Sequence, residues 1–365
     1  MAKRSPEAGD VLLMVGTRKG SFLYWSDPDR KDWHRSMAHD GWMIHHMMHD
    51  PRDNSIYAAT NSDVFGAVVQ RSSDFGASWE QRSEKLDYPG DTERRVRKAW
   101  HLALKPGSSP GHLYAGVERA GLFTTEDYGA NWAPVTGLND HAHSEDWTPG
   151  GGGLILHTIA VDPENSDRIY VGISAAGVYR SDDGGKTWAA KNVGVRADFL
   201  EEKFPEFGQC VHKFALHPAR PEVLYQQNHC GVYRSEDRGD TWLEITEGLP
   251  SEFGFPFAIH AHDPDTIYVV PLVGSENRVV PEGRMTVWRS RDKGNRWEPL
   301  TSGLPDGAYL TVLREGMAVD DCESSGVYVG TQTGQIFFSP DEGENWEVLA
   351  DFLPPIYSVS IGRVT

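Results

Sequence analysis

Ser181-Asp182-Asp183-Gly184-Gly185-Lys186-Thr187-Trp188 is the clearest copy of a short phrase that recurs along this chain of 365 residues. The pattern is Ser-x-Asp-x-Gly-x-Thr-Trp, and five further copies keep its spacing: Ser72–Trp79, Thr125–Trp132, Ser235–Trp242, Ser290–Trp297 and Ser339–Trp346. A degenerate seventh copy, Ser26–Trp33, keeps the Ser and the Trp. The seven tryptophans lie 46 to 56 residues apart. A period of this length indicates a repeat architecture.

Each repeat reads as four short strands around this phrase. In the clearest copy we expect Asp183 to accept backbone hydrogen bonds in a turn, with glycine supplying the left-handed conformation. Four-stranded units repeated about an axis form a β-propeller. The first repeat lacks an innermost strand, because Val11–Thr17 already reads as its second strand, and Ile356–Ile361 is predicted to fill the gap.

The sequence therefore predicts an all-β fold: a seven-bladed β-propeller of four-stranded blades, closed by the C-terminal strand joining the N-terminal blade. We divide the chain into an N-terminal tail, residues 1–10, and a single propeller domain, residues 11–365. Closing the ring in this way leaves no sheet edge open.

The repeated phrases resemble the Asp boxes of the BNR-repeat, sialidase-like β-propeller proteins, and the resemblance covers nearly the whole chain. In that family the boxes lie at the outer turn between strands three and four, away from the active face. The resemblance thus implies a structural role for the box aspartates. Val15–Phe22 also resembles the opening of bacterial proteins labelled exo-sialidase or glycosyl hydrolase by similarity, although sialidases have six blades rather than seven.

Composition excludes some partners. The net charge of −18 argues against nucleic acid and against an anionic membrane surface, since both need basic patches. The three cysteines, Cys210, Cys230 and Cys322, are too few for a disulfide framework and fit a reducing compartment. Met1–Asp10 shows no apolar core of a secretory signal. We expect a cytoplasmic protein with no membrane partner, and the oligomeric state stays open.

Long irregular loops mark one face of the predicted ring, which we call the top face. The connections 82–98, 137–154 and 192–209 stand over blades two to five, and blade six carries an excursion, Pro271–Met285. Functional residues gather on such loops. Gly150–Gly153 could let the backbone approach a ligand closely, form an anion-binding nest or serve as a flexible hinge. No phosphate-loop or dinucleotide fingerprint accompanies it, so no nucleotide cofactor is expected.

Histidines cluster at the top ends of the innermost strands. Aligned on the proline that follows each strand, His45, His157 and His212 share one level, and His46 and His101 fall one residue later. Imidazole is a common ligand of transition metals. These five residues are therefore candidate ligands of one divalent transition metal (Zn, Fe or Mn). The alternative is a water-filled polar funnel with ordinary hydrogen bonds.

Other candidates face the same mouth. The predicted catalytic residues are Glu118, Glu315 and Arg18, and the predicted substrate-binding residues are Trp100, Arg119, His229 and Arg314. An arginine can bind a carboxylate or phosphate through two parallel hydrogen bonds. Cys210 is expected opposite His229 or Cys230, as a thiol couple, a soft metal site or unreactive buried thiols.

Two functions remain open from the sequence. The first is a hydrolase or lyase acting on a small polar or glycosidic substrate at the channel mouth, with a histidine-bound metal or a carboxylate pair. The second is a non-catalytic binding or assembly module, which should show an exposed apolar or arginine-rich patch. Histidines and acids around the mouth favour the enzyme.

Overall fold

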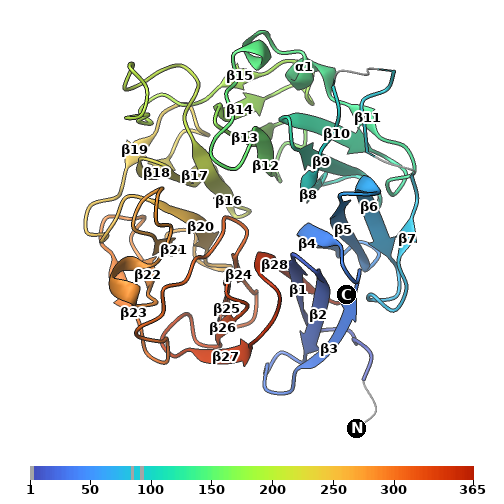
Figure 1. The fold of residues 1–365 in the computed structure, drawn as a ribbon, viewed down its shortest axis with the longest axis vertical. Helices are drawn as coiled ribbons and strands as arrows, with labels where there is room; N and C mark the ends of the chain where they lie inside the picture. The colour runs from blue at the N-terminus through green and yellow to red at the C-terminus, as the bar shows by residue number, and fades with distance from the viewer. Residues whose placement is uncertain (1–3, 84–85, 91–93) are drawn as a thin grey trace.

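The structure is a computed structural model that describes residues 4–83, 86–90 and 94–365. The first three residues of the predicted tail and parts of the 82–98 connection lie outside these ranges. Seven four-stranded antiparallel sheets stand as blades around a central axis (Figure 1). The prediction of a seven-bladed β-propeller is confirmed.

Each blade runs from an innermost strand beside the axis to an outermost strand at the rim. The innermost strands are β28 (Ile356–Arg363), β4 (Met43–Asp50), β8 (Ala99–Leu104), β12 (Ile155–Val161), β16 (Val211–His217), β20 (Gly254–Ile259) and β24 (Met317–Val319). The second strands are β1 (Val11–Thr17), β5 (Ser55–Ser62), β9 (Leu113–Val117), β13 (Ile169–Ser174), β17 (Arg220–Asn228), β21 (Ile267–Pro271) and β25 (Val327–Gly330).

The outer halves of the blades follow the same order around the ring. The third strands are β2 (Gly20–Ser26), β6 (Gly66–Ser72), β10 (Gly121–Thr125), β14 (Gly177–Ser181), β18 (Gly231–Ser235), β22 (Val287–Ser290) and β26 (Ile336–Ser339). The outermost strands are β3 (His34–Ala38), β7 (Glu80–Gln81), β11 (Ala133–Pro134), β15 (Ala189–Ala190), β19 (Leu243–Glu244), β23 (Glu298–Leu300) and β27 (Glu347–Ala350).

Among the residues that the structure describes, helical structure is limited to three short connections: α1 (Thr136–Asn139) and 3₁₀ turns at Ala142–Glu145 and Pro281–Gly283. In the described ranges, no helix has the length and apolar character needed to cross a membrane.

The repeated phrase forms the turn between the third and outermost strands. Asp183 Oδ1 accepts from the Thr187 backbone N–H at 2.9 Å and from the Ser181 hydroxyl at 2.8 Å, and Oδ2 accepts from the Thr187 hydroxyl at 2.6 Å. Gly185 has φ of +92°, which a side chain would strain, and Trp188 is buried. The box aspartate therefore holds the turn together through its hydrogen bonds, and the predicted structural role is confirmed.

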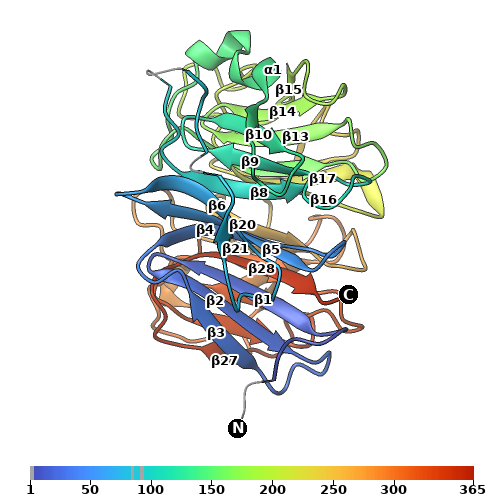
Figure 2. The same cartoon turned by 90° about the vertical axis from the view of Figure 1, so that its right-hand side faces the viewer.

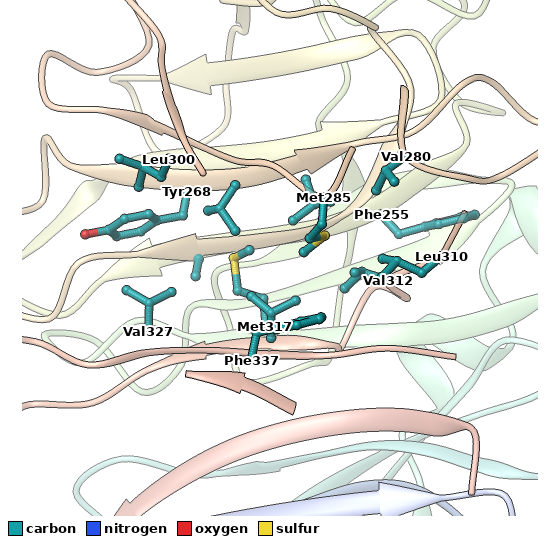
Figure 3. Packing of buried hydrophobic residues seen from close by; sticks show 14 of the residues in the cluster. Phe255, Tyr268, Val280, Met285, Leu300, Leu310, Val312, Met317, Val327 and Phe337 are labelled. Carbon is teal, nitrogen blue, oxygen red and sulfur yellow. The ribbon is translucent and has the colours of Figure 1, made fainter. Parts of the chain in front are cut away.

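Apolar side chains lock neighbouring blades together. Figure 3 shows one such cluster, in which Phe255, Tyr268 and Met285 of blade six pack against Met317, Val327 and others of blade seven. Corresponding clusters fill the remaining six junctions around the ring. Burial of this surface, at about 25 cal/mol per Å² of apolar area, holds the blades as one rigid ring.

The last strand closes the ring. β28 pairs antiparallel with β1 from Val11↔Arg363 to Thr17↔Ile356, and the two strands lie side by side in both views (Figures 1 and 2). The pairing confirms that the C-terminal segment supplies the missing innermost strand of blade one. The axis is therefore lined by seven innermost strands without a gap.

Candidate functional site

A cavity of about 580 Å³ opens where the innermost strands begin. Its walls combine the first residues of β4, β8, β16 and β20 with the segment 313–315 ahead of β24 and Tyr357 of β28. Gly151 and Gly152 of the glycine run, Ser174, His229, and Ser275, Glu276 and Arg278 of the blade-six excursion also line it. The cavity thus lies on the face that the long loops mark.

Six of the twelve residues predicted for the site line this cavity: His45, Trp100, His212, His229, Arg314 and Glu315. His46 and His101 adjoin it through Glu315, since the three present ligand atoms within 4.8 Å of one another. Glu118 lies behind Lys98, which lines the cavity and approaches the Glu118 carboxylate at 3.3 Å. Arg18, Arg119 and His157 are not part of the lining.

Glu315 is a buried carboxylate with two basic side chains beside it. It forms an ion pair with the Lys213 ammonium and lies 3.4 Å from His101 Nδ1. Burial alone would raise the pKa of this carboxyl, but attraction to Lys213 and His101 outweighs it and holds the pKa well below the ordinary value. Glu315 is therefore ionised at neutral pH.

Hydrogen bonds fix the tautomers of the first two histidines. Asn61 Oδ1 accepts from the Ala99 N–H at 2.8 Å, so the Asn61 amide NH₂ donates to His45 Nδ1 at 2.9 Å. His46 Nδ1 likewise accepts from the Leu102 N–H at 3.2 Å. Both rings therefore carry their proton on Nε2. Burial lowers the pKa of His45 to about 3, so this ring stays neutral.

His157 connects blades four and five through a hydrogen bond. Its Nε2 lies 2.9 Å from the Val211 carbonyl oxygen and its Nδ1 lies 2.9 Å from the Thr158 hydroxyl. The carbonyl can only accept, so Nε2 donates and Nδ1 accepts, and both ring nitrogens are occupied. The structure therefore does not gather the five predicted histidines around one point: His46 and His101 meet Glu315, His212 meets Cys210 and His229, and His45 and His157 stand apart.

Aromatic rings and cations share the rest of the lining. The Arg314 guanidinium lies 5.8 Å from the ring centre of Trp100 and 5.7 Å from that of Phe255, and its Nε donates to the His212 carbonyl at 3.2 Å. Burial lowers the pKa of Arg314. Tyr357 stacks on His45, with ring centres 4.9 Å apart. Flat apolar faces beside charged groups suit a polar ring-shaped ligand.

Other predicted residues lie at the margin. Arg18 is exposed, and its backbone N–H donates to the Pro355 carbonyl two residues before Tyr357. Arg119 is exposed in the turn after β9 with φ of +76°. Glu118 is buried and is held by Lys98 and, at 3.8 Å, by Arg97.

Sequence reasoning missed several lining residues: Phe253, Phe255, Glu276, Arg278 and Tyr357. The blade-six excursion marked the segment that carries Glu276 and Arg278, because its length breaks the repeat. Nothing in that segment distinguished the two residues that turn toward the axis. Tyr357 could have been found, since the closing strand must also present a side chain at the mouth.

Comparisons with known proteins agree with this architecture. A family model described as BNR/Asp-box repeat matches residues 179–190. The xyloglucanase of Hypocrea jecorina is 27% identical over 74% of this chain and 33% of its own length. Xyloglucanase Xgh74A of Acetivibrio thermocellus is 25% identical over 82% of this chain and 37% of its own length. The chain spans about a third of the length of these relatives.

Solved structures show the same fold. An ancestral GH74 enzyme matches 88% of this chain and 38% of its own with a TM-score of 0.56 at 16% identity. YCF48 bound to a D1 peptide matches 92% of this chain and 95% of its own with a TM-score of 0.54 at 12% identity. The resemblance to BNR-repeat proteins is confirmed: the chain is a seven-bladed Asp-box β-propeller, similar in sequence to xyloglucanases over most of its length.

Proposed function

We propose that the protein is a glycoside hydrolase that cleaves a short glycan in the cavity at the top of the propeller axis. The observation that carries the proposal is the lining itself, which includes the ionised Glu315, a second acidic side chain, Glu276, and the aromatic rings of Trp100 and Tyr357. The volume falls within the roughly 300–1,000 Å³ of small-molecule sites. The names of the xyloglucanase relatives support the same class of reaction.

Glycosidic cleavage uses one carboxyl group that donates a proton to the leaving oxygen and one carboxylate that stays ionised. Glu315 suits the second role, because Lys213 and His101 stabilise its charge. It would activate water or stabilise the positive charge that develops on the sugar. Glu276, on the blade-six excursion, is the second carboxyl group of the same cavity lining and is assigned the role of proton donor.

Arg314 favours a substrate with an acidic substituent. Among the described residues, no carboxylate lies within ion-pair distance of its guanidinium, although it borders the cavity and is flanked by two rings. A sugar carboxylate there would form a charge-assisted, two-pronged pair. Uronic-acid glycosides are therefore the first substrates to test, with neutral xyloglucan oligosaccharides beside them.

The test is hydrolysis of these two panels by purified protein, followed by chromatography of the released sugars. We expect turnover that Glu315→Gln and Glu276→Gln each reduce by at least roughly 100-fold. Glu282→Gln, an exposed residue of the same excursion outside the cavity lining, should keep full activity. Saturable binding of a glycan without turnover would instead favour the non-catalytic binding module. If the protein neither binds nor hydrolyses any glycan of the two panels, the proposal is refuted.

A further inference from the structure

Three groups that bind transition metals meet in one wall of the cavity. They are the thiol of Cys210 and the rings of His212 and His229, and one ligand atom from each lies within 4.8 Å of the other two. Cys210 and His212 stand at the start of β16, and His229 lies in the turn between β17 and β18. The His229 backbone N–H donates to the Cys210 carbonyl at 2.9 Å, which ties the turn to the strand.

The tautomer of His212 leaves one nitrogen available. Its Nδ1 lies 2.5 Å from the Gly254 carbonyl oxygen, which can only accept, so Nδ1 carries the proton. Nε2 therefore directs its lone pair toward Cys210 Sγ, 3.6 Å away. Histidines that bind metals typically donate their second ring N–H to a carbonyl in this way, because the bond fixes both the tautomer and the orientation of the ring.

The spacing of sulfur and nitrogen fits a shared ion. Zinc bonds of about 2.3 Å to sulfur and 2.0–2.1 Å to nitrogen, at a tetrahedral angle, place the two ligand atoms roughly 3.6 Å apart. The observed separation of Cys210 Sγ and His212 Nε2 is 3.6 Å. No movement of either side chain is required to form that edge of a tetrahedron.

Aromatic rings hold the two imidazoles in place. Phe253 packs edge-on against both His212 and His229, with ring centres 5.1 Å apart in each case. Phe255 lies on His212 at 4.5 Å, and Phe199 borders His229 at 5.2 Å. Ligands fixed by packing lose little freedom when an ion binds, so the site is preorganised.

A second cluster, His46, His101 and Glu315, has comparable spacing but the wrong chemistry. The lone pair of His46 Nδ1 already accepts from the Leu102 N–H, so its Nε2 carries a proton. The Glu315 carboxylate is occupied by the Lys213 ammonium, which a cation would have to displace. This cluster is an ion-pair network rather than a second metal site.

We propose that Cys210, His212 and His229 bind one zinc-class divalent cation whose fourth coordination position opens into the cavity. One thiolate and two neutral imidazoles are a borderline-soft set that zinc prefers, and three protein ligands leave one position for water or a substrate oxygen. The thiolate offsets repulsion from Arg278 and Arg314, which line the same space. The assignment does not depend on glycosidase activity, because metal binding is measured directly.

The experiment is titration of the untagged, chelator-treated protein of 365 residues with Co²⁺ and then Zn²⁺. We expect one Co²⁺ per chain, with a sulfur-to-cobalt charge-transfer absorption that Zn²⁺ abolishes by displacement. Cys210→Ser should remove this absorption, and Cys210→Ser and His229→Gln should each weaken binding by more than the roughly 10–100-fold cost of losing an outer-sphere partner. Cys322→Ser, which replaces a buried cysteine outside the cavity lining, should bind like the parent.

Circular dichroism of each variant separates loss of the site from loss of the fold, and His229→Gln is the safer variant because that side chain is only half-buried. Absence of binding by the folded parent would overturn the proposal. Binding without a thiolate absorption would also overturn it, because Cys210 would then not be a ligand. Binding that survives Cys210→Ser and disappears in His101→Ala would overturn it by placing the ion at the cluster of His46, His101 and Glu315.

Discussion

Lys213 of blade five and Glu315 of blade seven form an ion pair that reaches past the intervening blade six. His101 of blade three adds a third side chain to the same carboxylate, and His46 of blade two stacks on His101 with ring centres 4.2 Å apart. Four blades therefore contribute to one charged cluster beside the axis. The cluster ties distant parts of the ring together and fixes the ionised carboxylate that the proposed reaction uses.

Breaking this pair from one side should destabilise the protein. Glu315→Gln leaves the Lys213 ammonium in a largely buried setting without its partner, and loss of one member of a buried pair costs about 3–5 kcal/mol. Urea unfolding followed by tryptophan fluorescence gives the free energy. The double variant Lys213→Met/Glu315→Gln should recover part of the loss, and equal stability of the single variant and the parent would contradict the account.

The Asp boxes should make stability sensitive to acid. Hydrogen bonds from the Thr187 hydroxyl and N–H lower the pKa of Asp183 to about 2. A depressed folded-state pKa gives a stabilising contribution that is complete above the ordinary aspartate pKa and is lost as the pH falls through the folded value. Asp183→Asn should therefore flatten the fall in melting temperature between about pH 4 and pH 2. Asp29→Asn, at an exposed aspartate outside the box hydrogen bonds, is the control. If the melting temperature of Asp183→Asn falls with pH as steeply as that of the parent, the hydrogen bonds of Asp183 do not stabilise the turn.

The degenerate first box, Ser26–Trp33, should be stabilised by an ion pair with blade seven instead of by the usual box residues. Arg30 stands where the other boxes have glycine, with φ of +55°, and its guanidinium forms a buried ion pair with Asp320 of blade seven at 2.9 Å. Arg30→Gly restores the box residue but leaves Asp320 without its cation. We expect a net loss of about 3–5 kcal/mol in urea unfolding. Lys31→Gly, at an exposed neighbouring position, is the matched control, and a more stable Arg30→Gly protein would show that backbone strain dominates.

Gly16 of β1 is packed so closely against its neighbours that adding a methyl group there should destabilise the protein. A Cβ on Gly16 of β1 would lie 2.5 Å from the Ile44 carbonyl oxygen and 2.5 Å from Ser358 Oγ. Because the first contact is backbone, Gly16→Ala should cost about 1–3 kcal/mol. Gly152→Ala, whose nearest neighbour would be Ile155 Cδ1 at 3.7 Å, should leave the melting temperature nearly unchanged. Similar melting temperatures for the two variants would rule out this packing constraint.

The fold could be predicted from the sequence because each blade repeats one local solution. The box turn needs Asp183 and Gly185 at fixed spacing, and the period then counts the blades. The missing strand of blade one followed from the position of Val11–Thr17, which left one unpaired segment near residue 356. These signals are local or periodic, so a single chain displays them.

The site was predictable only to the level of a face. Strand alignment correctly brought His45, His212 and Glu315 to the mouth, but alignment says nothing of the hydrogen bonds that each side chain makes. His157 faces Val211 and Thr158 instead of a shared ion. The blade-five hairpin was predicted correctly, since Cys210 lies opposite His229, whose backbone N–H donates to the Cys210 carbonyl at 2.9 Å. The sequence did not show that His212 Nε2 approaches Cys210 Sγ at 3.6 Å. Such relations arise from packing, not from spacing.

Ring closure by β28 also has a consequence for synthesis of the chain. Val15 of β1 is translated 344 residues before its pairing partner Val359. At roughly 5–20 residues per second, β1 waits on the order of 20–70 s for the strand that covers its edge. During that interval the nascent propeller carries an open, apolar strand edge of the kind that recruits other chains. We therefore expect the chain to be most prone to aggregation during its synthesis, before β28 pairs with β1.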